Sequence, residues 1–266
     1  MNDHFDTADQ TPSPSLKLLR FEVERLESVD STNRYILDRA SSGASEGLVI
    51  VADHQSSGRG RLERTWDAPV GASLLMSVLL RPTLKIEELH VLNMAAGVAM
   101  AKAVMSLHPQ LSIGLKWPND LYSENRKLGG ILTESIISNE QVTVAVGIGV
   151  NLDWTPEQLG ALGRPAASVS SLVGAPSAGR EAVLKAFLDE YGSIYRSLSS
   201  FEGRATISSE YRKYCVTIGQ MVSVEMADDS FVGVALDVAP GGELMVAIDS
   251  CVRMVSTGDV VHLNML

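Results

Sequence analysis

The chain has 266 residues, 45% of them hydrophobic and 20% charged, a balance that fits an ordinary globular protein of one large or two unequal domains. Its 22 Lys and Arg against 32 Asp and Glu give a formal net charge of −10, which argues against a globally basic nucleic-acid binder. The two cysteines, Cys215 and Cys251, form neither a metal-ligand spacing nor a disulfide framework, so we expect free thiols in a reducing compartment.

The first segment is a polar tail over residues 1–15, which lacks periodicity and is expected to be disordered. It does not resemble a signal peptide, and nothing before Phe21 can form a DNA-reading helix. The longest apolar stretch, residues 91–101, is far short of the ~20 residues that a membrane span requires. We therefore expect a soluble cytoplasmic protein that binds neither DNA nor a membrane.

Residues 16–216 are expected to form one domain that contains both helices and strands. Runs of apolar and β-branched residues predict the strands, and apolar residues three and four apart predict the helices. In chain order, these elements are a short helix capped by Asp30-Ser31-Thr32-Asn33, strands at 48–53 and 74–80, a helix at 87–107, a strand that ends at Lys116-Trp117, a hairpin with strands at 128–135 and 142–150, a loop of small residues at 163–180 and a helix at 181–198.

The pattern changes near Gly219, and residues 217–266 are expected to form a second, smaller domain. Short strand-like runs follow one another there, separated by turn signals such as Gly258-Asp259. Runs at this spacing predict a small β-barrel, which makes the whole chain an α+β protein. The runs lie at 221–226, 231–238, 244–248, 252–255 and 260–263.

Residues 58–66, with the sequence GRGRLERTW, are the first candidate for a binding site. Arginine carries forked donors that suit phosphate and carboxylate groups. Glycine lets backbone N–H groups approach a ligand closely, and Trp66 offers a face on which a base can stack. The alternative is a solvated, mobile loop that is anchored by a buried tryptophan.

The second candidate combines Lys116-Trp117-Pro118-Asn119-Asp120 with Arg126-Lys127-Leu128-Gly129-Gly130. Lys127 opens a predicted buried strand and is interpreted as a lone cation, without a partner carboxylate nearby in the sequence. Burying an unpaired ammonium is costly, so a functional role is expected for it. The Gly-Gly step leaves open space beside it. The alternative is a surface lysine at the end of a strand.

Two weaker motifs complete the set. Gly147-Ile148-Gly149-Val150-Asn151 indicates a strand with room for a flat ligand and an amide that can bond a purine edge, or simply a capped strand end. Ser31-Thr32-Asn33 offers hydroxyl and amide groups to a small polar ligand, or is an ordinary helix cap.

In this order, the motifs STN, GRGR with Trp66, KWPND, RKLGG and GIGVN resemble the biotin protein ligase family, and the resemblance spans roughly residues 21–266. It implies a mixed sheet flanked by helices, related to class II aminoacyl-tRNA synthetases and lipoate ligases, with an SH3-like C-terminal domain. It also indicates the monofunctional type, which lacks the N-terminal DNA-binding domain of the repressor members.

The family's reaction has two steps. Biotin and ATP, with Mg²⁺, give biotinyl-5′-AMP and pyrophosphate. A lysine of a carrier protein then takes the biotinyl group and releases AMP. The implied partner is the biotin carboxyl carrier protein or domain of an acyl-CoA or pyruvate carboxylase, and we expect a monomer or a weak homodimer.

The resemblance also implies roles for individual residues. Lys127 and Arg61 would be catalytic: Lys127 touches both the biotin carboxylate and the α-phosphate, and Arg61 helps close the loop over the intermediate. The metal ligands stay unassigned. The biotin-binding residues would be Ser31, Thr32, Gln55, Gly58, Arg59, Lys127, Gly130 and Leu132. The nucleotide-binding residues would be Arg61, Arg64, Trp66, Lys116, Asn119, Asp120, Gly147 and Asn151, with Trp66 packed over the adenine and Asn151 at its edge.

The chain departs from the family pattern in the loop, where Leu62 and Glu63 stand at positions at which Arg and Gly are common. The spacing from Gly58 to Trp66 is kept. The change therefore bears on how tightly the loop holds the intermediate and ATP, and it leaves Arg61 in place.

Two other functions fit parts of the sequence. A lipoate or octanoate ligase or transferase on the same fold must accept an acyl tail, and the pairing of GRGR with KWPND does not point to it. A nucleic-acid-binding module could use the Gly-Arg loop, but the net charge and the lack of interleaved aromatic and basic residues argue against it.

Overall fold

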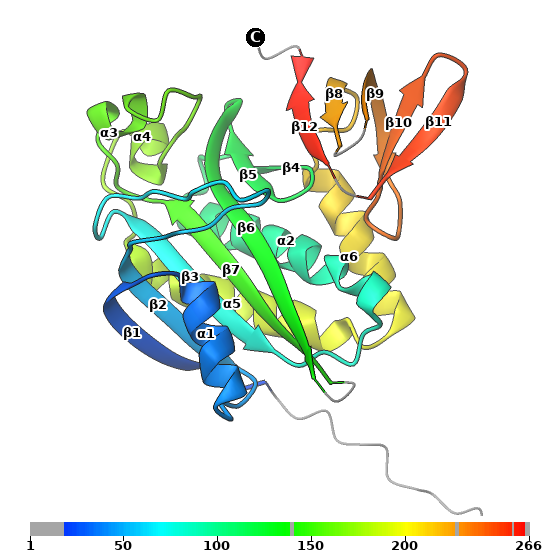
Figure 1. Ribbon diagram of the computed structural model, residues 1–266. Coiled ribbons are helices and arrows are strands. Elements are labelled where there is room, and N and C mark those ends of the chain that lie inside the picture. Colours follow the sequence, from blue (N-terminus) through cyan, green and yellow to red (C-terminus); the bar gives the residue numbers. More distant parts are fainter. Residues whose placement is uncertain (1–18, 139–140, 227–228, 257, 264–266) are drawn as a thin grey trace, which may run out of the picture.

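Two β-sheets organise the chain in a computed structural model, which describes residues 19–138, 141–226, 229–256 and 258–263 (Figure 1). A seven-stranded mixed sheet is built from the strands up to Asn151, and a five-stranded antiparallel sheet from Met221 onward. The tail predicted over residues 1–15 lies outside the described residues.

The large sheet has the strand order β1-β2-β3-β7-β6-β5-β4. β1 and β2 run parallel, and the other neighbouring pairs are antiparallel. All eight residues of the central strand β3 are buried, because helices cover both faces of the sheet there. The strands are β1 (Glu22–Val29), β2 (Leu48–Gln55), β3 (Ser73–Leu80), β4 (Gly114–Lys116), β5 (Asp120–Ser123), β6 (Arg126–Ser138) and β7 (Gln141–Asn151).

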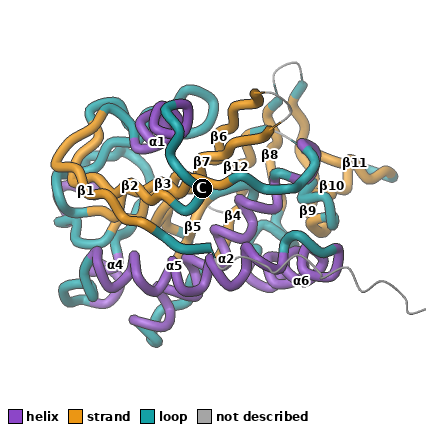
Figure 2. The backbone as a smooth tube through the Cα atoms, turned by 90° about the horizontal axis from the view of Figure 1, so that it is seen from below, coloured by secondary structure: helices purple, strands orange, loops and turns teal. Residues whose placement is uncertain are grey.

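Helices cover the two faces of this sheet unequally (Figure 2). On one face, α1 (Thr32–Ser41) packs Ile36 and Ala40 against Ile50 of β2 and Leu79 of β3. The long helices lie on the opposite face. These are α2 (His90–Leu107), α5 (Arg180–Ser197) and α6 (Phe201–Tyr214), while a 3₁₀ turn (Ile86–Glu88), α3 (Pro156–Gly160) and α4 (Val169–Val173) are short.

Helix α2 forms the middle of the main core. Together with the 3₁₀ turn it makes a stretch, Ile86–Leu107, that is long and apolar enough to cross a membrane, yet 72% of its apolar window is buried inside the protein. Leu92, Val98 and Met100 are fully enclosed. A predominantly apolar helix that is enclosed in this way is typical of a protein core.

Most predicted elements are present, and several others are not predicted by the sequence pattern. β1 has the sequence EVERLESV, whose charged residues lie on an exposed edge and hide the strand pattern. β5, α3 and α6 are also additional. The predicted loop at 163–180 is wrong at Val169–Val173, where the Ser168 hydroxyl caps α4 by accepting the Ser171 N–H at 3.2 Å.

The small sheet has the strand order β11-β10-β9-β8-β12 and matches the five predicted runs. It docks on the large sheet around Trp117, whose backbone N–H donates to Thr217 Oγ1 at 2.9 Å and whose indole N–H donates to Gly242 O at 2.8 Å. This docking places β12 beside the turn between β4 and β5. The strands are β8 (Met221–Glu225), β9 (Ser230–Val238), β10 (Leu244–Ile248), β11 (Cys251–Val255) and β12 (Asp259–His262).

Candidate active site

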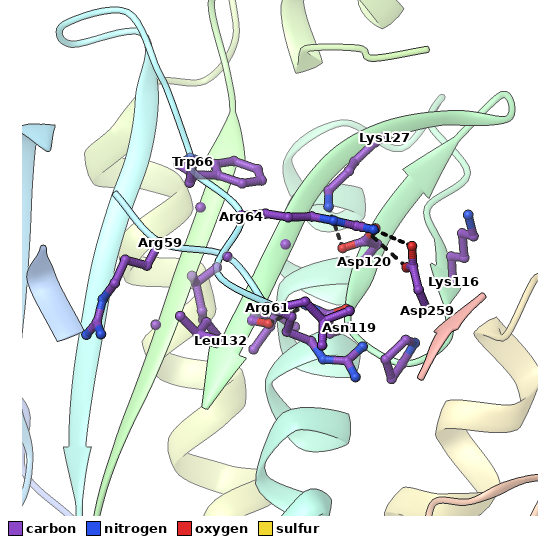
Figure 3. A pocket seen from close by; sticks show the side chains of 18 of the residues that line it. Arg59, Arg61, Arg64, Trp66, Lys116, Asn119, Asp120, Lys127, Leu132 and Asp259 are labelled. Atoms are coloured by element: carbon purple, nitrogen blue, oxygen red, sulfur yellow. Dashed lines mark hydrogen bonds and ion pairs between the residues drawn. The ribbon is translucent and has the colours of Figure 1, made fainter. Parts of the chain in front are cut away.

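One cavity of about 320 Å³ gathers the motifs that the sequence singles out (Figure 3). It lies between the start of α1, the loop of residues 58–66, strands β6 and β7, and strand β12 of the small sheet. Each predicted site residue lines it except Gly58 and Asn151. The fold therefore brings together segments from both ends of the chain.

The end of the cavity beside α1 is neutral and polar. The Thr32 N–H and hydroxyl donate to Gln55 Oε1 at 2.8 and 3.0 Å, and the Ser77 hydroxyl donates to Asn33 Oδ1 at 2.6 Å. Ser31 is the N-cap residue of α1, but its side chain makes no capping hydrogen bond. Capping therefore does not explain why a hydroxyl is present at this position. These groups offer preoriented donors and acceptors to a small polar ligand.

Two side chains that the sequence analysis does not assign hold this end together. Asn33 Nδ2 donates to Glu134 Oε2 at 2.8 Å and to Leu132 O at 2.9 Å, which ties α1 to β6. Glu134 also pairs with Arg59 at 3.0 Å. Asn33 belongs to the Ser31-Thr32-Asn33 motif, so its position in that motif is a signal that could have identified it. Glu134 gives no such signal.

Glycines of β6 and β7 line the cavity but leave less open space than the sequence predicts. A Cβ at Gly147 would lie 2.3 Å from Asn33 Oδ1, and a Cβ at Gly149 would lie 2.6 Å from the Trp66 ring. At Gly130, a Cβ would meet the same ring at 3.3 Å. The expectation is corrected accordingly: part of this space accommodates the side chains of Asn33 and Trp66 of the protein itself.

Lys127 is not the lone cation that the sequence suggests. Its Nζ forms an ion pair with Asp120 Oδ1 at 2.6 Å and lies 5.6 Å from the centroid of the Trp66 ring. The expectation is wrong because β5 pairs with β6 and sets Asp120 opposite Gly130, in reach of Lys127. Each partner is only 19% exposed, so their attraction is stronger than that of a surface pair. The indole Nε1 of Trp66 is buried without a hydrogen-bond partner.

The opposite end of the cavity is cationic. Burial lowers the pKa of Lys116 and that of Arg61, because removal from water disfavours the charged form. Lys116 Nζ lies 5.2 Å from the centroid of the Tyr122 ring, and Arg64 forms an ion pair with Asp259 of β12. In the sequence Asp259 is only part of a turn signal, and the docking of the small sheet is what brings it to the site.

Residues 58–66 form a hairpin, in which the Trp66 N–H donates to Gly58 O at 2.9 Å. Gly58 must be glycine, because a Cβ there would lie 2.2 Å from the Trp66 carbonyl oxygen. It therefore shapes the loop and does not line the cavity. At the tip, Leu62 and Glu63 have φ angles of 53° and 58°, a left-handed conformation that costs roughly 1 kcal/mol or more per non-glycine residue.

The two asparagines of the predicted nucleotide site have different surroundings. Asn119 Nδ2 donates to Ile131 O at 2.7 Å, which fixes the turn between β4 and β5 at the cavity wall. Asn151 is buried outside the cavity lining, and its Nδ2 donates to Ala167 O at 3.0 Å. Its Oδ1 has no partner and remains an unused acceptor. The predicted contact of Asn151 with an adenine edge stays a prediction.

The described residues contain no group of three or more His, Cys, Asp or Glu that could hold a metal ion. Asp120 and Asp259 are the carboxylates that line the cavity, and each is paired with a cation. Mg²⁺ needs few protein ligands when phosphates complete its shell. This donor set suits a metal that arrives with a nucleotide better than a resident one.

Comparison of the sequence with known proteins gives consistent matches. Residues 26–151, which include all the cavity motifs before the small sheet, match the model of the biotin/lipoate A/B protein ligase family. The chain is 33% identical to the biotin–[acetyl-CoA-carboxylase] ligase of Mycobacterium tuberculosis, over 91% of this chain and 90% of that protein. It is 27% identical to the bifunctional ligase/repressor BirA of Bacillus subtilis, over 87% of this chain and 71% of that protein.

Comparison with solved structures supports the expected fold class. The biotin protein ligase of Aquifex aeolicus in complex with biotin and ATP is similar with a TM-score of 0.76 and 24% identity, over 90% of this chain and 97% of that one. The ligase of Leishmania major in complex with biotinyl-5-AMP has a TM-score of 0.59 and 25% identity, over 91% and 98%. An α+β fold with a mixed sheet, flanking helices and a small C-terminal β-sheet is therefore confirmed.

Proposed function

This chain belongs to the biotin protein ligase family, and on that premise we propose how its cavity works. It joins biotin to a lysine of an acceptor protein at the expense of ATP, by way of biotinyl-5′-AMP. The observation that carries the proposal is one cavity with a neutral polar end at α1 and a cationic end at Arg61, Arg64 and Lys116, with Lys127 between them. This division suits an uncharged ring at one end and phosphates at the other.

The ureido ring of biotin is assigned to the neutral end. There the hydroxyls of Ser31 and Thr32 and the amide of Gln55 line the cavity, together with Arg59 of the loop. The hydrogen bonds around Asn33 hold these side chains in place before biotin binds. Binding therefore costs little further side-chain entropy. The acyl chain runs along Gly130 and Leu132 toward Lys127.

The first chemical step brings two anions together. An oxygen of the biotin carboxylate attacks the α-phosphorus of ATP, the bond from that phosphorus to the bridging oxygen breaks, and pyrophosphate leaves with the bonding electrons. At ~4 Å and an effective dielectric constant of about 20, two unit charges repel by roughly 4 kcal/mol. Lys127, between the two ends of the cavity, carries the ammonium that offsets this repulsion.

The cationic end is assigned to the nucleotide. Arg61, Arg64 and Lys116 face the phosphates, and Trp66 packs on the adenine. The other residues assigned to this end are Asn119 and Asp120 of the β4–β5 turn, and Asn151 through its unused Oδ1. Gly147, predicted for the nucleotide, is assigned to the neutral end instead, because its Cβ position faces Asn33. Mg²⁺ belongs to the nucleotide substrate and offsets the charge of pyrophosphate, and we assign it no protein ligand.

The second step transfers the biotinyl group. The neutral amine of the acceptor lysine attacks the carbonyl carbon of the mixed anhydride, the bond from that carbon to the phosphate oxygen breaks, and AMP leaves. The nitrogen gives up one proton to solvent. Because biotinyl-5′-AMP also reacts with water, a hairpin that closes the cavity protects the intermediate between the two steps.

The acceptor is a protein that carries biotin, and we propose the carrier protein or domain of an acyl-CoA or pyruvate carboxylase. The name of the mycobacterial relative supports this choice. The free thiols of Cys215 and Cys251 support a reducing cytoplasm. We also propose a catalytic domain over residues 16–216, a second domain over 217–266, and a chain that acts as a monomer or weak homodimer.

Intact-mass measurement of a purified carrier domain tests this function. Incubation with the chain, ATP and biotin should add one biotinyl group to one lysine, and lipoate or octanoate in place of biotin should add nothing. Comparable transfer of lipoate or octanoate would favour the alternative ligase of this fold. A carrier that stays unmodified with biotin would refute the proposal.

A further inference from the structure

The hairpin of residues 58–66 contacts the small sheet through two arginines. Arg61 Nη2 donates to the carbonyl oxygen of Gly258 at 3.2 Å. Arg64 donates to both carboxylate oxygens of Asp259, with Nη1 and Oδ1 at 3.3 Å. Figure 3 shows Arg64 extended from the hairpin to Asp259, past Lys127 and Asp120. The hairpin is thus fastened to strand β12.

The contact between the hairpin and the small sheet engages Arg64, one of the cations at the cationic end of the cavity. Asp259 and Asp120 are the carboxylates that line the cavity, and they neutralise Arg64 and Lys127, respectively. Burial would raise the pKa of the Asp259 carboxyl, but the hydrogen bond and charge of Arg64 hold that pKa below its usual value. Two parallel N–H···O bonds from a guanidinium to a carboxylate are the geometry with which arginine also binds phosphate.

The tip of the hairpin is closed by two backbone hydrogen bonds within the hairpin, from Gly60 N–H to Arg64 O at 2.6 Å and from Arg64 N–H to Arg61 O at 3.2 Å. Leu62 is 62% exposed, so it gives the tip no apolar anchor. Leu62 and Glu63 both hold the left-handed conformation that disfavours side chains. The bonds of Arg61 to Gly258 and of Arg64 to Asp259 add restraints from outside the hairpin to this strained, exposed tip.

We propose that Asp259 is a positioning residue that occupies Arg64 in place of a phosphate and holds the hairpin against the small sheet until the nucleotide arrives. The identity of the displacing anion rests on the proposed function. A phosphate of ATP takes Arg64 from the carboxylate, so that the hairpin passes from a contact within the protein to a contact with the substrate. Because a polyphosphate carries more negative charge than one carboxylate, Arg64 is attracted more strongly to the nucleotide than to Asp259.

Limited trypsin digestion of the nucleotide-free chain tests the contact. Asp259→Asn removes the charge and keeps the size of the side chain. Asp229→Asn is the matched control, because Asp229 forms an ion pair with Arg253 at 2.6 Å on the same sheet and does not line the cavity. Cleavage after Arg61 and Arg64 should be about fivefold faster in Asp259→Asn, unchanged in the control, and slow again in Asp259→Glu.

Binding of ATP supplies the second measurement. The KM for ATP should fall about threefold in Asp259→Asn, since the nucleotide no longer displaces a carboxylate. A structural role for Asp259 would raise that KM instead, and circular dichroism verifies that the variant is folded. Equal cleavage of parent and Asp259→Asn, or a raised KM, overturns the proposal. Cleavage needs no catalysis, so a difference that persists in a chain unable to make biotinyl-AMP supports the contact while the proposed function fails.

Discussion

Replacement of Lys127 by Ala should cost more than the loss of one hydrogen-bond donor. Loss of a preorganised donor at a developing charge typically lowers the rate by ~10²–10³. Here the same change also leaves Asp120, 2.6 Å from the missing ammonium, unneutralised beside the attacking carboxylate and the phosphate. At about 6 Å and an effective dielectric constant of about 20, that carboxylate adds roughly 3 kcal/mol, or another ~10². Together the two effects predict a rate lower by ~10⁴ or more.

Single-turnover release of pyrophosphate with biotin and ATP, without an acceptor, measures this rate. Asp120→Asn in the Lys127→Ala background should recover ~10² of the loss, because it removes the unneutralised charge. Circular dichroism establishes that both variants fold. Near-normal pyrophosphate release by folded Lys127→Ala would show that Lys127 is not the cation of the first step. A double variant no faster than the single one would show that Asp120 adds no repulsion.

Three further changes have defined outcomes. Arg61→Gly should release biotinyl-5′-AMP faster and label bystander lysines, as measured by mass spectrometry of a mixture of proteins; labelling confined to the carrier would contradict this. Gly149→Ala should displace Trp66, because the added Cβ would lie 2.6 Å from its ring, and should change the tryptophan emission; an unchanged spectrum would argue against the packing. Burial lowers the pKa of His262 from 6.5 to about 4. The unfolded chain therefore takes up this proton first as the pH falls, and stability present above pH 6.5 is lost toward pH 4. His262→Gln should lose less stability over that window in urea titrations, and an equal loss would refute the assignment.

The motifs can be recognised from the sequence because each one has an unusual local composition. The loop of residues 58–66 and the Gly-Gly step at 129–130 hold residue types that ordinary strands avoid, and they stand out without knowledge of the fold. The cavity then collects them because strands β6 and β7 pair along their length. Composition and periodicity also indicate the core, since β3 and α2 are predominantly apolar.

The contacts between motifs depend on strand pairing and on the docking of the small sheet, which no local sequence pattern reveals. Asp120 reaches Lys127 only because β5, which looks like a turn in the sequence, pairs with β6. Open space predicted over Gly149 is filled by Trp66 from a loop more than 80 residues away. Asp259 enters the site through the docking of the small sheet, which rests on bonds from Trp117 to Thr217 and Gly242. Such long-range placement follows from packing and not from propensity.

The first half-reaction proposed for this cavity joins biotin to AMP. The most direct measurement is mass spectrometry of the small molecules formed when the purified chain is incubated with biotin, ATP and Mg²⁺ but no acceptor protein. The protein should retain one equivalent of biotinyl-5′-AMP, with matching release of pyrophosphate, and Lys127→Ala should retain almost none. Retention of unreacted biotin and ATP without any adduct, by a folded parent chain, would contradict this proposal.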